Sequence, residues 1–207
     1  LSLIKTSWYN KQLRDGNPSV PINLSDEWID QNLFAQRWDE PKSMKIADIE
    51  IPAKDVPNAD YFLEGTSRKI PVIETHTWMI WRIVQQANWE RPIYFAVTVP
   101  ISNMAGLKAN LSMEGMAYRL VKEQTPNHFD VKKVSNNLLK IYQFRSVSDS
   151  TVYKDPVARR LLGNYLVLFD GLVQSYLKQG LYKKAFQTLQ EAEKRVPPYA
   201  IDTPETW

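Results

Sequence analysis

The chain of 207 residues contains no cysteine and only two histidines and seven glycines. Without cysteine there are no disulfides, thiolate nucleophiles or cysteine-ligated zinc sites. His76 and His128 are far apart in the sequence, and neither lies in a metal-ligand spacing or beside a nucleophile-elbow motif. The scattered glycines form no phosphate-binding loop. We therefore expect no metal, no cofactor and no catalytic constellation in this chain.

Long apolar runs and a strong excess of one charge are also missing. No apolar run approaches the ~20 residues that a membrane-spanning helix needs. The 26 basic and 23 acidic residues give a formal net charge of only +3, and the basic residues are dispersed. Nucleic acid is therefore not an expected partner. The hydrophobic share of 43% is that of an ordinary globular protein.

The sequence does contain one uncharged run of seven residues, Ile93 to Val99, which follows Pro92 directly. Proline favours an extended entry, and a continuous apolar run is typical of a central parallel strand covered on both faces. Before it, apolar residues recurring every three or four positions predict a helix over 74–88. A helix followed by a buried strand predicts an α/β fold, with a small, mainly parallel sheet and flanking helices.

The periodicity becomes helical after residue 155. Two amphipathic helices are expected over 157–178 and 182–195, closed by Pro197 and Pro198. The order of large and small residues matches a tetratricopeptide repeat. The matching positions are Phe169, Leu172, Tyr176, Gly180, Ala185, Leu189, Ala192 and Pro197. The chain is thus expected to comprise an α/β domain, residues 1–155, and a tetratricopeptide-like helical hairpin, residues 156–207. One repeat cannot bury a core alone, so we expect it to dock on the first domain or continue into further repeats.

Two glutamates are candidate ligand-binding residues. Glu90 and Glu114 lie near the ends of expected strands, where open α/β sheets bind ligands. Sugar chemistry commonly uses two carboxylates. The commoner role of such residues is ion pairing, here with Arg91 and Arg119.

An aromatic pair, Trp8 and Tyr9, is the other candidate for ligand binding. It follows the first expected strand, where flat amphipathic rings could stack on a sugar face. The alternative, which we favour, is that the pair packs the first helix against the sheet.

Five segments occur together in an order that resembles a known family. The chain is similar to the C-terminal part of the protein O-mannosyltransferase-like membrane proteins of Gram-negative bacteria, a family of unknown function predicted to be glycosyltransferases. The segments that carry the resemblance are LSLIKTSWYNKQLRD, VPINLSD, NWERPIYFAVTV, EGMAYRLV and YKDPVARRLLGNY.

The resemblance implies that this chain is one region of a longer polypeptide and that catalysis belongs to another region. Membrane helices would carry the lipid-linked sugar chemistry, and this chain would lie on the periplasmic face of the inner membrane. It would then be an accessory or acceptor-binding domain, not catalytic by itself. Its partners would be a glycan or protein acceptor and the rest of the membrane-embedded polypeptide. Two alternatives stay open: an autonomous enzyme acting on glycans, and a structural protein-interaction module that uses the helical repeat.

Overall fold

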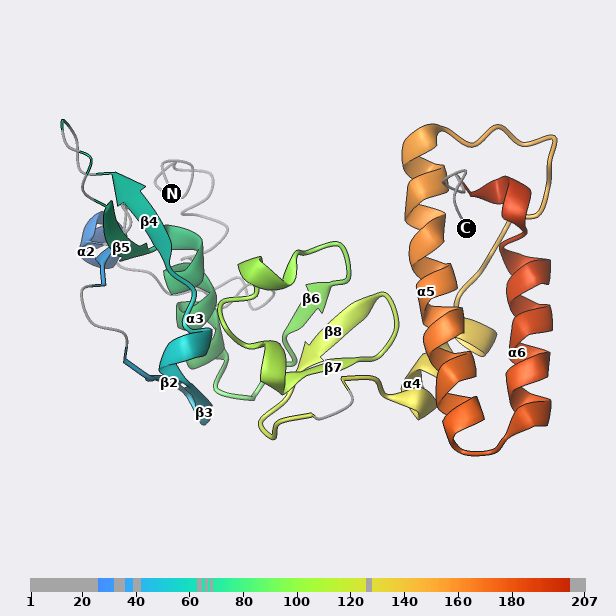
Figure 1. Cartoon of the computed structure of the whole chain (residues 1–207), viewed down its shortest axis with the longest axis horizontal. Coiled ribbons are helices and arrows are strands. Elements are labelled where there is room, and N and C mark those ends of the chain that lie inside the picture. The colour runs from blue at the N-terminus through green and yellow to red at the C-terminus, as the bar shows by residue number, and fades with distance from the viewer. Residues whose placement is uncertain are drawn as a thin grey trace. The chain divides into compact units, whose positions relative to one another are not determined.

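The computed structural model describes residues 26–31, 36–38, 42–62, 65, 67, 69–125 and 128–201. The chain divides into two compact units (Figure 1). The first unit comprises residues 1–111 and 120–125, and the second comprises residues 112–119 and 126–207.

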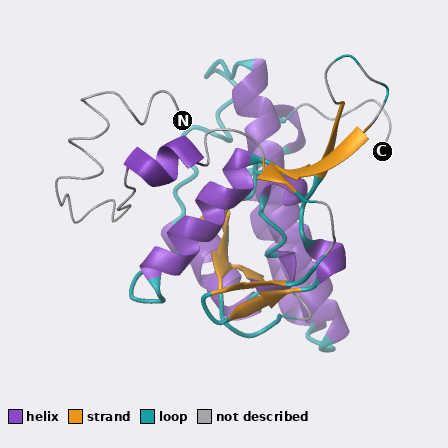
Figure 2. Cartoon of the chain, turned by 90° about the vertical axis from the view of Figure 1, so that its left-hand side faces the viewer, coloured by secondary structure: helices purple, strands orange, loops and turns teal. Residues whose placement is uncertain are grey.

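Short helices and strands build the first unit. In chain order they are α2 (Asp26–Gln31), β1 (Gln36–Arg37), β2 (Met44–Ile46), β3 (Ile49–Ile51), β4 (Ala59–Phe62), β5 (Lys69–Ile73), α3 (Thr75–Ala87) and β6 (Tyr94–Ala96). Strands β1, β5 and β4 form one antiparallel sheet in that order, and β2 and β3 form an antiparallel hairpin. Strands β7 (Leu111–Met113) and β8 (Ala117–Leu120) follow, and residues 112–113 and 117–119 of them belong to the second unit. The strands are short in every case (Figure 2).

The expectation of a mainly parallel sheet was wrong, because the sheets of the described residues are small and antiparallel. Within the run Ile93 to Val99, only Tyr94–Ala96 forms a strand. Phe95 is buried, whereas Tyr94 and Ala96 are exposed. The alternation shows a strand with one covered face. Tyrosine, alanine and threonine tolerate solvent, so a run without charge was not evidence of burial on both faces.

Helix α3 lies where the sequence predicted a helix, and it anchors the core of the first unit. Trp81 is almost fully buried, and its indole Nε1 donates a hydrogen bond to the Ala105 carbonyl oxygen at 2.9 Å. The Trp78 ring meets the Trp81 ring edge to face, with centroids 5.1 Å apart. The helix ends at Asn88, which adopts a left-handed conformation with φ 41°, as a C-terminal cap commonly does.

Helices dominate the second unit. Helix α4 (Val131–Asn136) continues into a π-helical turn, Asn137–Ile141. Helices α5 (Pro156–Lys178) and α6 (Tyr182–Arg195) form a pair close to the expected bounds and lie side by side (Figure 1). Asp155 begins α5 by accepting hydrogen bonds from the backbone N–H groups of Val157 and Ala158.

The helix pair shares one core with α4 and the π-helical turn. This core contains Val134, Leu138, Leu168, Phe169, Leu172, Val173, Tyr176, Ala185, Ala192 and Val196. Two helices alone bury too little apolar surface to offset their ordering entropy, and α4 supplies the missing layer. One position of the expected repeat pattern differs: Leu189 is 52% exposed and is not part of this core.

None of the helices in the described residues has the length and apolar character to cross a bilayer.

Candidate functional site

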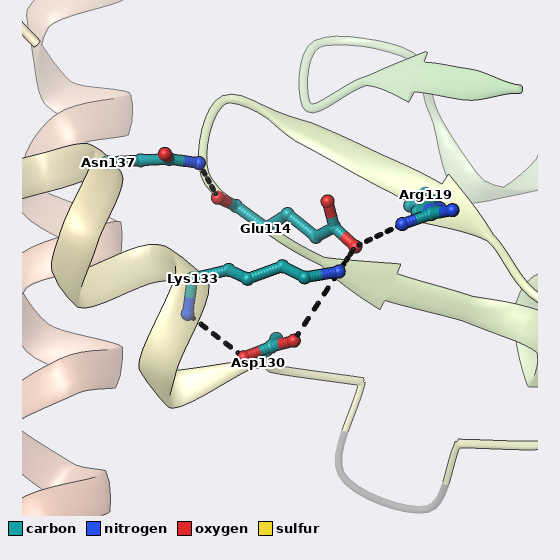
Figure 3. A network of polar contacts seen from close by, with 5 residues as sticks. All are labelled: Glu114, Arg119, Asp130, Lys133 and Asn137. Carbon is teal, nitrogen blue, oxygen red and sulfur yellow. Dashed lines mark hydrogen bonds and ion pairs between the residues drawn. The ribbon is translucent and has the colours of Figure 1, made fainter. Parts of the chain in front are cut away.

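A polar cluster surrounds Glu114 (Figure 3). Its Oε1 lies 2.5 Å from Lys133 Nζ and 3.7 Å from Arg119 Nη1. Lys133 Nζ also lies 3.8 Å from Asp130 Oδ2. The Glu114 side chain is only 12% exposed, so solvent screens little of the attraction between its carboxylate and these two cations.

The backbone around Glu114 is fixed as firmly as its side chain. The Asn137 side-chain amide donates to the Glu114 carbonyl oxygen at 2.5 Å, and Glu114 N–H donates to the Ala117 carbonyl oxygen at 3.1 Å. The next residue, Gly115, has φ +146° and leaves no room for a Cβ beside the Tyr142 hydroxyl. The turn between β7 and β8 therefore needs glycine at this position.

Helix α4 brings Lys133 to the cluster through its own N-terminal cap. Asp130 Oδ1 accepts a hydrogen bond from the Lys133 backbone N–H at 3.0 Å, and this bond begins the helix. The Lys133 side chain then points back toward Glu114 and Asp130 (Figure 3). One lysine is thus both part of the capping turn and the bridge between two carboxylates.

The charges of the Glu114 cluster suit a structural link better than a catalytic site. Two carboxylates and two cations sum to no net charge, so the cluster offers little net attraction to a charged substrate. The Lys133 ammonium lies between the two carboxylates, where a glycosidic oxygen would have to lie for paired acid and base catalysis. The arrangement fits a link between the β7–β8 turn and α4.

A second polar cluster lies at the start of α3. The Tyr61 hydroxyl donates to Glu74 Oε1 at 3.0 Å, and His76 Nδ1 lies 3.7 Å from Glu74 Oε2. The hydrogen bond and the negative charge of Glu74 raise the pKa of Tyr61 above its ordinary value. A nucleophilic tyrosine would need a lowered pKa, so the contacts with Glu74 disfavour the phenolate form that such a reaction requires.

The structure places the predicted ligand residues as follows. Glu114 has a largely buried side chain and forms an ion pair with Arg119, as its commoner role predicted. Glu90 is exposed in the turn after α3, where its N–H donates to the Ala87 carbonyl oxygen at 2.8 Å. Glu90 belongs to the first unit and Glu114 to the second. Trp8 and Tyr9 lie outside the described residues.

Lys133 is the central residue that sequence reasoning missed. It is 19 positions from Glu114, and no local pattern connects the two. The one available signal was the spacing of Asp130 and Lys133, which places a cation one turn inside a capped helix. Within the described residues, no group of three His, Asp or Glu side chains is arranged to hold a metal ion.

Comparison with known families places part of the chain beside a described family model. Residues 54–138 match the family model described as TMEM260-associated domain 2. TMEM260 is a family of O-mannosyltransferase-like membrane proteins, and residues 54–138 are similar to a domain associated with that family. The expected relation to O-mannosyltransferase-like membrane proteins is confirmed for residues 54–138, as a match to an associated domain. The match includes Glu90, Glu114, Asp130 and Lys133, and it ends before α5. Searches of curated proteins and of solved structures gave no match.

Proposed function

We propose that this chain is an accessory domain of a membrane glycosyltransferase, that it works on the periplasmic side, and that it binds an acceptor or a partner without performing sugar transfer itself. The observation that carries the proposal is the match of residues 54–138 to a domain associated with an O-mannosyltransferase-like membrane family. The sugar chemistry of the whole protein would then belong to its membrane region.

The two polar clusters around Glu114 and Glu74 support a non-catalytic role. Glu114 and Asp130 share Lys133, and Tyr61 is a hydrogen-bond donor to Glu74. The carboxylates of the Glu114 cluster are paired with cations, and the Glu74 carboxylate is bound by the Tyr61 hydroxyl, whereas a general acid or base needs a proton-transfer group that faces the substrate. An autonomous glycan-active enzyme is therefore the less supported alternative.

Transfer assays with two proteins test the proposal. The purified chain, given a polyprenyl-phosphate-linked sugar and acceptor peptides, should form no glycosylated product. The intact gene product, in membranes, should lose transfer when residues 54–138 are deleted, with its insertion level unchanged by immunoblot. Product formed by the purified chain alone would overturn the non-catalytic role. Undiminished transfer by the deleted protein would overturn the accessory role.

A protein-interaction module is the second candidate, and a specific observation favours it. Helix α6 presents Tyr182, Phe186 and Leu189 on an exposed face. Contiguous exposed apolar surface is a mark of interaction sites.

A further inference from the structure

No further inference is drawn: the strongest candidate, the exposed apolar line of Tyr182, Phe186 and Leu189 on α6, is followed by exposed charges of both signs at Glu193 and Lys194, and nothing in the structure shows what covers it.

Discussion

The guanidinium group of Arg195 donates hydrogen bonds to the backbone carbonyl oxygen of Leu138, 57 positions earlier, and to that of Leu139, both at 2.9 Å. These carbonyls belong to the π-helical turn after α4, at a helix end where carbonyl groups lack partners within the helix. Arg195 Nε is held by Glu191 Oε2 at 2.7 Å, and its guanidinium carbon lies 5.5 Å from the centre of the Phe144 ring. The last turn of α6 thus caps the helical segment on which the helix pair packs.

Removal of the Arg195 guanidinium should destabilise the second unit. Arg195→Met keeps an aliphatic stem of similar reach and leaves two carbonyl groups without their charged donor. We expect a loss of about 2–4 kcal/mol in the free energy of unfolding, since hydrogen bonds to charged groups are each worth ~1.5–3 kcal/mol. Urea denaturation followed by circular dichroism measures it. Arg160→Met, at an exposed position of α5, is the control and should change stability by less than ~0.5 kcal/mol. Equal stabilities for the two variants would contradict the capping role.

Substitution of Gly115 should disturb the turn that presents Glu114. In Gly115→Ala the new Cβ would collide with the Tyr142 hydroxyl, at a backbone φ that other residues rarely adopt. Backbone strain and crowding together predict a cost of about 2–4 kcal/mol. Gly163→Ala is the matched control, because Gly163 is inside α5 and, apart from its chain neighbours and the adjacent helix backbone, no heavy atom lies within 4 Å of the site a Cβ would take. That variant should gain roughly 0.5–1 kcal/mol from helix propensity. Thermal unfolding of both proteins gives the comparison, and a neutral Gly115→Ala would show that the turn is not constrained.

The pair Glu114 and Lys133 should contribute measurably, but modestly, to stability. We expect a coupling free energy of ~0.5–1.5 kcal/mol from a double-mutant cycle of Glu114→Gln and Lys133→Met, because Lys133 is 44% exposed and solvent screens part of the attraction. The control cycle uses Asp48 and Lys122, a pair 3.0 Å apart whose side chains are both at least half exposed. Its coupling should be smaller and should fall further in high salt. A larger coupling for the exposed pair would contradict the importance assigned to the Glu114 cluster.

The Tyr61 hydroxyl should titrate at a higher pH than an ordinary tyrosine. Its folded-state pKa is raised by the Glu74 carboxylate, so the folded chain holds this proton more tightly than the unfolded chain does. The associated stability is complete below the unfolded pKa of about 10, and it is lost as pH rises through the folded pKa. Glu74→Gln should lower the pKa of Tyr61, measured by carbon NMR of the tyrosine ring with Tyr61→Phe used for assignment. Asp60→Asn, next to Tyr61 in β4, is the control. An unchanged Tyr61 titration in Glu74→Gln would contradict the assigned cause.

The sequence alone determined the local parts of this protein. The helices α3, α5 and α6 were predictable because a helical face repeats every three or four residues. The caps at Asp130 and Asp155 are local in the same way, because a capping side chain bonds to N–H groups two or three residues ahead. The relation to a membrane transferase-like family was also evident from segment order, and the match over 54–138 supports it.

Only the tertiary structure decided which segments meet. Parallel and antiparallel strands pair through the same backbone N–H and C=O groups. The uncharged run from Ile93 to Val99 therefore did not reveal the direction of the neighbouring strand. It also did not reveal that one face of the strand is exposed. The contacts of Glu114 with Lys133, of Met116 with Tyr142 and of Arg195 with Leu138 join residues 19, 26 and 57 positions apart. Each requires a preformed turn or helix end at both partners. Their energies therefore depend on folding as a whole, and no short stretch of sequence encodes them.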